Sequence, residues 1–571
     1  MARLVIGIAL SIAKLLYNIH DMNRLWSLFT RKQQTIGSAA VILVSMVFVS
    51  RVLGLVRDRM LNARFVPDEL GVYFAAFRLP NLIFELLVMG ALTSAFIPVF
   101  TKYLTQKDNE EGFRMAATLI NLSIAVLVVF SLPILLFTKP LSQFLAPGFS
   151  AQQIDQMVSF TRLMVLFQVL PLLVGNFFTG ILQSYNLFLV PAIAPVLYNI
   201  GIIVGIIILT PIFGLLGPVY GVGIGAVLFM LIQLPLIVAV GYRHRMTLAV
   251  KHKGVREVLR LIGPRTFGLA VSQIDTTVDL MLASLLGARM VTIFNFAQHL
   301  QQFPVGLFGA TVAQAALPSL SAAWVKEDVD GFKKSIVQAI HQILFFVLPV
   351  SALFIVLRIP IVRLVFGASR FDWQATVLTG VTLSMFSTSL FAQAIVHVLA
   401  RGFYALYDTK TPVAVSVISI AVNTIASILF IRVFGLPVWS LGLSTSIASI
   451  LNAIVLFFLL NRRVHGFARR DLVVPVLKML VAATVAGIAV YIPLKIFDQL
   501  VFDTTRTFGL ILLTGFTGGI GMITYLLLVW VFDVNEMKAF IALISRVRRP
   551  KAVILAPANE VINGGIQDKI S

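Results

Sequence analysis

Long apolar runs separated by short polar or basic loops dominate the 571-residue chain. About fourteen of them hold roughly 20 mostly apolar residues, the length that a helix needs to cross a bilayer. They begin near residues 36, 71, 115, 158, 188, 219, 264, 291, 334, 376, 412, 439, 472 and 507. Because the runs are continuous and do not alternate with polar residues, they exclude a transmembrane β-barrel. The pattern predicts an all-α, polytopic membrane protein.

An internal repeat organises the first twelve of these runs. Pro98, in an Ile-Pro pair, returns as Pro318 in a Leu-Pro pair. Tyr185 returns as Tyr407 at nearly the same offset along the chain, with a proline soon after each. Six predicted helices separate the copies, and an even number gives both copies the same orientation. This is a parallel repeat, as seen in alternating-access transporters.

The repeat predicts two lobes of six helices each, followed by two further helices. The predicted parts are an N-terminal interfacial segment (1–35), a first lobe (36–242), a basic linker (243–263), a second lobe (264–461), two extra helices (472–532) and a tail (533–571).

The net charge of +21 reflects topology and predicts no nucleic-acid partner. Of the 45 Lys and Arg, 30 lie in the termini and in the loops after even-numbered helices, 10 lie in the other loops and 5 lie within the apolar runs. By the positive-inside rule both termini are expected in the cytoplasm. The basic linker is interpreted as a topology determinant that rests on anionic headgroups.

No catalytic motif is present. The chain has no cysteine, which excludes disulfides and Cys-ligated metals. The glycines from Gly221 to Gly225 lie inside an apolar run, so we interpret them as helix-packing positions and not as a phosphate loop. We therefore expect a protein that is not an enzyme.

Charged residues inside the apolar runs carry the functional signal. Arg51, Arg57 and Asp58 lie at the end of the first run, and Arg78 and Glu85 lie within the second. Such charges cost roughly 2.5 kcal/mol or more in hydrocarbon, so they should face a bundle interior or a watery cavity, or pair with one another.

Two carboxylates, Asp275 and Asp279, lie four residues apart and therefore on one face of the seventh predicted helix. They would be very costly there without a cation or a proton.

Several motifs together resemble the MviN/MurJ family of lipid II flippases, which belongs to a larger superfamily of two-lobed exporters. They are S-R-V-L-G-L-V-R-D (50–58), F-R-L-P-N-L (77–82), G-A-L-T-S-A-F-I-P (90–98), A-P-G-F (146–149), F-P-V-G (303–306), L-P-S-L-S (317–321) and G-F-Y-A-L-Y-D-T-K-T-P (402–412). The resemblance covers roughly residues 36–530.

The resemblance implies a cationic cavity between helices 1, 2, 7 and 8 that receives the pyrophosphate of a lipid-linked precursor. Arg51 and Arg57 match family arginines. The departures from the family pattern are Phe84 and Glu85 near a usual arginine, Met89 for an acid, Gln298 and His299 for an Asp-Arg pair, and Gly71 for an aspartate.

These observations predict a flippase that moves lipid II across the bacterial inner membrane by alternating access. The substrate-binding residues would be Arg51, Arg57, Arg78, Glu85, Gln298 and His299. Two alternatives stay open: an exporter of another polyprenyl-linked glycan, and a non-transporting scaffold that has kept the fold. Expected partners are the polyprenyl-diphosphate precursor, membrane lipids and the cell-wall synthesis machinery.

The resemblance also implies a sodium site, with Na⁺ as coupling ion, in the second lobe; no other cofactor is expected. Its ligands would be Asp279, Asn423, Ser427 and Thr445. Carboxylate, amide and hydroxyl oxygens are ligands that suit a hard cation.

Overall fold

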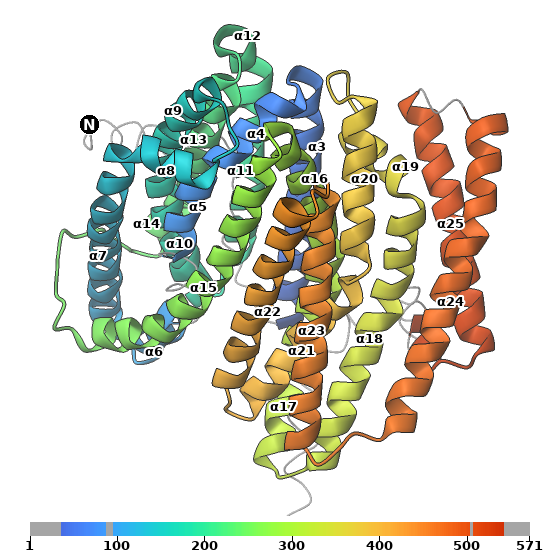
Figure 1. Ribbon diagram of the computed structural model, residues 1–571. Coiled ribbons are helices and arrows are strands. Elements are labelled where there is room, and N and C mark those ends of the chain that lie inside the picture. The colour runs from blue at the N-terminus through green and yellow to red at the C-terminus, as the bar shows by residue number, and fades with distance from the viewer. Residues whose placement is uncertain (1–35, 87–94, 503–505, 539, 542–571) are drawn as a thin grey trace, which may run out of the picture. The chain divides into compact units, whose positions relative to one another are not determined.

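The computed structural model describes residues 36–86, 95–502, 506–538 and 540–541. Every regular element in these ranges is a helix, which confirms the all-α prediction (Figure 1). The predicted N-terminal segment (1–35) and most of the predicted tail lie outside the described residues.

The α-helices are α3 (Ile36–Arg64), α4 (Pro67–Ala76), α5 (Arg78–Phe84), α6 (Ile97–Thr105), α7 (Asn109–Leu136), α8 (Thr138–Leu145), α9 (Ala151–Phe167), α10 (Val169–Ser184), α11 (Leu189–Val204), α12 (Thr210–Phe213), α13 (Leu216–Leu231), α14 (Leu234–Ala239), α15 (Lys253–Leu285), α16 (Ala288–Pro304), α17 (Thr311–Val325), α18 (Val329–Val356), α19 (Arg358–Phe366), α20 (Trp373–Ser387), α21 (Leu390–Ala405), α22 (Lys410–Ile428), α23 (Trp439–Arg463), α24 (Arg469–Ile496) and α25 (Thr507–Val531). The π-helical turns that lie whole within the described ranges are η3 (Gly205–Leu209), η4 (Val305–Ala310), η5 (Leu429–Val433) and η6 (Phe497–Val501).

The described chain divides into two compact units. The first holds the chain up to Phe303 together with Arg358–Phe386 and Val413–Asn452. The second holds Pro304–Leu357, Ser387–Pro412 and the chain from Ala453 onward. Every predicted site residue lies in the first unit. The predicted lobe boundaries stay a prediction.

The described helices include ten that are long and apolar enough to cross a membrane, or eleven if the bent pair α20 and α21 forms one span. The predicted number of fourteen is therefore not confirmed. The predicted spans that begin near residues 36, 71 and 264 are missing from this set. The first is the 29-residue helix α3, and the third lies within α15, which begins already at Lys253.

The span predicted near residue 71 is broken at Phe77 into α4 and α5. Pro80 has no N–H to donate to the carbonyl of Ala76, four residues earlier. The hydroxyl of Thr161 on α9 donates to that carbonyl instead, at 3.2 Å. A neighbouring helix thus satisfies the backbone group that the proline leaves unpaired, which is how membrane helices tolerate proline.

The internal repeat reappears in the backbone. Asp108 caps the 28-residue helix α7, and Asp328 caps α18, which has the same length. Two non-glycine residues with positive φ, Asn186 and Tyr407, follow the ends of α10 and α21 at nearly the same offset as the two capping aspartates. The predicted repeat is thus matched in helix lengths, caps and turns.

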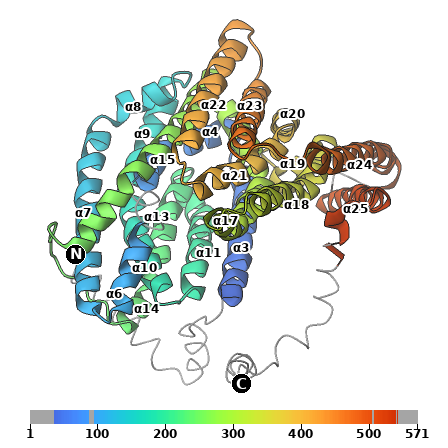
Figure 2. The same ribbon diagram turned by 90° about the horizontal axis from the view of Figure 1, so that it is seen from below.

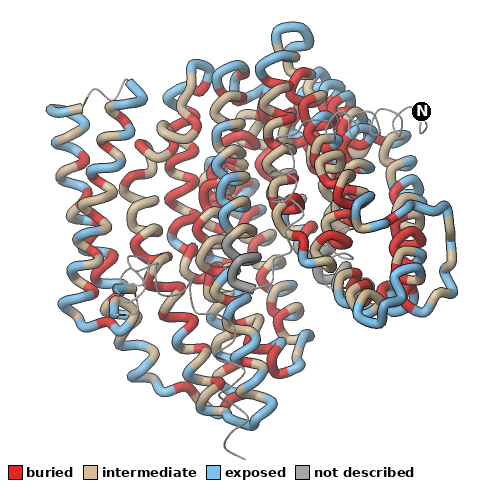
Figure 3. Tube along the Cα trace, turned by 180° about the vertical axis from the view of Figure 1, so that it is seen from behind, coloured by how far each residue is buried: buried red, intermediate tan, exposed pale blue. Residues whose placement is uncertain are grey.

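Glycines allow α11 and α13 to pack in close contact within the first unit (Figure 2). A Cβ on Gly201 of α11 would lie 2.3 Å from the Cα of Gly225 on α13. A Cβ on Gly221 would lie 3.0 Å from the Cα of Gly205. These contacts confirm the interpretation of Gly221 to Gly225 as packing positions. Buried positions lie mainly on the sides of helices that face neighbouring helices (Figure 3).

Candidate functional site

A cluster of charged side chains joins α3 to α16 and α11 in the first unit. Arg57 Nε and Nη2 donate to Asp58 Oδ1 at 2.9 and 2.8 Å. The other carboxylate oxygen, Oδ2, lies 3.1 Å from Nδ1 of His299 on α16. Arg57 Nη1 donates to Oδ1 of Asn199 on α11 at 3.2 Å. One carboxylate therefore contacts two of the predicted substrate-binding residues.

Arg51 and Arg57 of α3 differ in how many of their N–H groups are available to a ligand. Asp58 is 1% exposed and the Arg57 side chain 18% exposed, so their pair is shielded from water. Arg51 is exposed, and one of its amino groups donates to the carbonyl of Gln302 at 3.3 Å. A guanidinium has five N–H donors, so Arg51 keeps most of them for an anion.

Arg78 on α5 is held by α15. Its Nε donates to Oγ1 of Thr277 at 2.9 Å, and its Nη2 donates to the carbonyl and side-chain oxygens of Gln273 at 2.6 and 2.8 Å. Nε2 of Gln273 donates to Glu85. Arg78 and Glu85 thus contact the same amide, and Arg78 is 8% exposed. The arrangement makes Arg78 a buried link between helices that keeps little donor capacity for a substrate.

The predicted sodium ligands are brought together in part. Asn423 Nδ2, on α22, donates to Oδ1 of Asp275 at 2.9 Å and to Oδ1 of Asp279 at 3.3 Å. The Oδ1 of Asn423 is buried and has no hydrogen-bond partner among the described residues. Two carboxylates therefore converge on the amide nitrogen of Asn423 between α15 and α22, and the oxygen of the same amide lacks a partner among the described residues.

The two predicted hydroxyl ligands separate. Oγ of Ser427 on α22 lies 2.5 Å from Oγ of Ser444 on α23, in place of the expected Thr445. Thr445 instead donates to the carbonyl of Leu441 in its own helix at 2.9 Å. The side chain that meets Ser427 is thus the neighbour of the predicted one.

The structure explains one departure from the family pattern. A Cβ on Gly71 of α4 would lie 1.8 Å from the carbonyl oxygen of Ala288 at the start of α16, so no aspartate fits there. Gln298 is half-buried beside His299 on α16. Met89 lies outside the described residues.

Three residues that contact predicted site residues were not assigned to the site from the sequence. Asn199 is an isolated polar residue in the apolar helix α11, and Ser444 adjoins the predicted Thr445. Gln273 carries no stronger signal in the sequence than the other polar residues of its helix. An isolated amide in an apolar helix is a usable signal because a buried amide needs hydrogen-bond partners.

Comparison with solved structures defines the fold class. The fold matches an inward-facing transporter of the MOP superfamily, a multidrug resistance MATE protein, with a TM-score of 0.61 over 75% of this chain and 98% of that one at 15% identity. It also matches the structure described as "Lipid II flippase MurJ, inward closed conformation", with a TM-score of 0.71 over 87% and 100% of the two chains at 24% identity. The chain therefore shares the polytopic helical fold of these two proteins.

The family is then shown by sequence. The model of the family described as "Lipid II flippase MurJ" matches residues 68–509, and the chain belongs to this family. The lipid II flippase MurJ of Burkholderia cenocepacia is 28% identical over 426 residues, which cover 73% of this chain and 82% of that one. A probable lipid II flippase MurJ of Bdellovibrio bacteriovorus is 28% identical over 521 residues, 90% and 96% of the two chains. These matches favour the flippase interpretation over the two alternatives.

Proposed function

We propose that this chain is a transporter that moves lipid II across the bacterial inner membrane and changes no covalent bond. Membership of the family supports the substrate class. The observation that carries the proposal is the charged cluster of Arg51, Arg57, Asp58 and His299 on α3 and α16. Charges inside membrane helices are expensive and mark substrate pathways.

The cluster can hold a diphosphate in two stages. Arg51 is exposed and binds an anion without losing an ion pair. Arg57 is already paired, so an incoming phosphate must compete with Asp58 for its N–H groups. Arginine-phosphate contacts are charge-assisted and often bidentate, which makes such competition effective. Asp58 keeps His299 as a partner when Arg57 turns to the substrate.

We propose further that Asp275, Asp279 and Asn423 hold a monovalent cation that couples transport to an ion gradient. The residues fit such an ion because two carboxylates converge on one buried amide, whose nitrogen contacts both and whose oxygen lacks a partner among the described residues. With the amide of Asn423 turned so that Oδ1 takes the place of Nδ2, a cation there would offset the carboxylate charge and provide the partner that Oδ1 lacks. We also propose that both termini of the chain lie in the cytoplasm and that the chain associates with the cell-wall synthesis machinery.

Rescue of a bacterium depleted of its own flippase tests the main proposal. The intact chain should sustain growth, and the Arg51→Ala and Arg57→Ala variants should not. The matched control is Lys139→Ala, which removes an exposed cation paired with Asp155. Failure of the intact chain at normal membrane levels, or full rescue by both arginine variants, would refute the proposal.

A further inference from the structure

An extended segment connects α14 to α15 and crosses the outside of α7 (Figure 1). We call residues 243–252 the basic strap. Asn121 of α7 fixes it by donating to the carbonyls of Arg245 and Thr247 at 3.0 and 2.9 Å. His244 adds a bridge, with Nε2 2.9 Å from Oδ1 of Asn121 and Nδ1 3.0 Å from the hydroxyl of Tyr242. Burial lowers the pKa of His244, which favours its neutral form. The strap is thus attached to α7 at a defined place.

Three apolar side chains of the strap point outward. Met246 is 93% exposed, Leu248 64% and Val250 46%. They alternate with Arg245, Thr247 and Ala249, as expected for extended chain, in which successive side chains point to opposite sides. Contact with water alone does not explain why so short a segment exposes three apolar side chains on one side.

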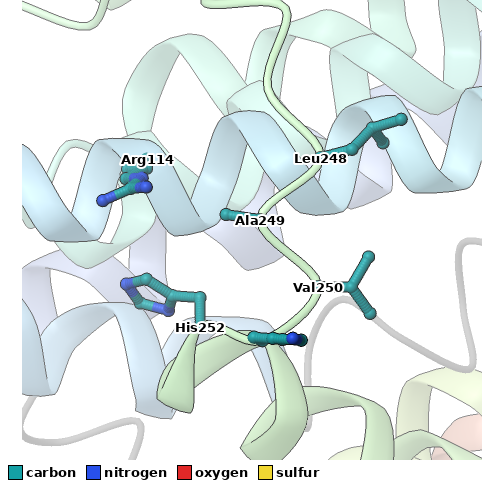
Figure 4. A pocket seen from close by; sticks show the side chains of 6 residues that line it. Arg114, Leu248, Ala249, Val250 and His252 are labelled. Carbon is teal, nitrogen blue, oxygen red and sulfur yellow. The ribbon is translucent and has the colours of Figure 1, made fainter.

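A hollow of about 470 Å³ opens where the strap meets α7, and Arg114, Lys251 and His252 line it together with Leu248 and Val250. Arg114 and His252 face the hollow, while the side chains of Leu248 and Val250 point away from them (Figure 4). His252 Nδ1 accepts from the N–H of Gly254, and Nε2 lies 2.8 Å from Glu111. Arg114 also contacts Glu111, at 3.2 Å. Lys251 is exposed and forms no ion pair with the described residues, so it can supply charge for an anion.

The backbone of the strap sets its depth in the membrane. Extended chain beside a membrane-spanning helix leaves N–H and C=O groups that hydrocarbon cannot satisfy. Asn121 satisfies two of the carbonyls, and the N–H groups of Thr247, Val250 and His252 donate to carbonyls within the strap. The groups that are still unpaired need water or lipid headgroups. The strap must therefore lie at the membrane surface, with Met246 and Leu248 in reach of acyl chains and its cations in reach of headgroup phosphates.

We propose that the basic strap and the hollow beside it form a binding site for an anionic phospholipid. The phosphate lies by Lys251 at the hollow, and Arg243 adds a second exposed cation on the strap. The acyl chains lie along Met246 and Leu248. The pairing of exposed cations with outward apolar side chains matches a molecule that carries both a phosphate and hydrocarbon. An acidic protein segment would match the cations but not the apolar row on a strap at the membrane surface.

Thermal unfolding of the purified full-length chain in mixed micelles tests the site. Phosphatidylglycerol should raise the melting temperature more than phosphatidylcholine does, and the difference should shrink as salt rises. Arg243→Gln with Lys251→Gln should weaken the apparent affinity for phosphatidylglycerol about 25-fold, given the usual contribution of each basic residue near an anionic surface. The matched control is Lys326→Gln with Lys334→Gln, two exposed lysines elsewhere in the chain.

Further arms separate lipid from other anions. Met246→Ser with Leu248→Ser should weaken phosphatidylglycerol binding and leave any effect of inorganic phosphate unchanged. Equal stabilisation by both lipids, or an equal loss in the control variant, would overturn the proposal. The full effect with inorganic phosphate alone would also overturn it, because this result would indicate a simple anion site. The full effect with poly-glutamate alone would overturn it as well, because the strap would then recognise charge without hydrocarbon.

Discussion

At the scale of single residues, Asp58 decides what the arginines of α3 can do. Its two oxygens contact Arg57 and His299, so the cation of Arg57 is held by a carboxylate in the absence of substrate. Arg51, nearer the start of the same helix, is exposed and forms no ion pair with the described residues. Two arginines of one helix thus have different roles: one is open to an anion, and the other must exchange partners.

The Asp58→Asn variant should be strongly destabilised. It leaves Arg57 buried without its counter-charge, and breaking a buried pair in this way costs about 3–5 kcal/mol. The matched control is Arg51→Gln, which removes an exposed cation and should melt near the intact chain. Thermal unfolding in detergent checks both variants, and equal melting temperatures for Asp58→Asn and the intact chain would contradict the description of this pair.

Glu85 should weaken the binding of anions. It shares the Gln273 amide with Arg78, so its charge offsets that of the Arg78 guanidinium. Glu85→Gln should therefore bind a diphosphate lipid several-fold more tightly, because the negative charge is removed while the hydrogen bond to Gln273 can be kept. Glu257→Gln on the exposed side of α15 is the control. Unchanged or weaker binding in a lipid titration of Glu85→Gln would count against the prediction.

The residue scale also shows what sequence can and cannot provide. Charges inside apolar runs identified Arg51, Arg57 and Asp279, because their cost in hydrocarbon is high regardless of fold. Asn199, the partner of Arg57, and Gln273, the partner of Arg78, were not assigned. Helix periodicity gives the face on which a residue lies but not the helix that meets this face.

At the scale of elements, close helix contacts depend on residues without side chains. Gly201 and Gly225 bring α11 and α13 together, and Gly71 brings α4 against the start of α16. Membrane helices associate through such small residues because lipid offers no hydrophobic drive between them. The same contact explains why Gly71 departs from the family pattern, which no amount of hydropathy analysis could have shown.

Gly225→Val should destabilise the chain, whereas Gly515→Val should not. A Cβ on Gly225 would lie 2.3 Å from the carbonyl oxygen of Tyr198, while one on Gly515 of α25 would meet nothing within 4 Å. Overpacking lowers the free energy of unfolding by about 1–3 kcal/mol. Here the obstructing atoms belong to the backbone, which cannot move away by changing a side-chain rotamer. Melting temperatures of the two variants should differ clearly, and indistinguishable values would contradict the packing of α11 on α13.

At the scale of the whole molecule, repetition was predicted more reliably than the number of spans. The repeat offset appears in the sequence and again in the caps of α7 and α18, because turn and cap residues mark the same backbone geometry twice. The spans near residues 71 and 264 were harder to predict, since Pro80 breaks one and the other continues a helix from the basic linker. Window hydropathy does not register either effect.

Sodium should stabilise the intact chain, and Asp279→Asn should abolish the effect. A ligand that binds only the folded state adds about 2.7 kcal/mol at a concentration 100 times its Kd. Asp279 is 3% exposed and shares Asn423 with Asp275, so loss of its charge removes a central ligand. Asp275→Asn is the informative second variant. If Asp275 is a ligand of the cation, this variant also loses the sodium response; if Asp275 only repels Asp279, the variant keeps the response. Melting in sodium is compared with melting in choline, which is too large for the site. Equal melting in the two salts for the intact chain, or an undiminished sodium response in Asp279→Asn, would leave these carboxylates without a role in cation binding.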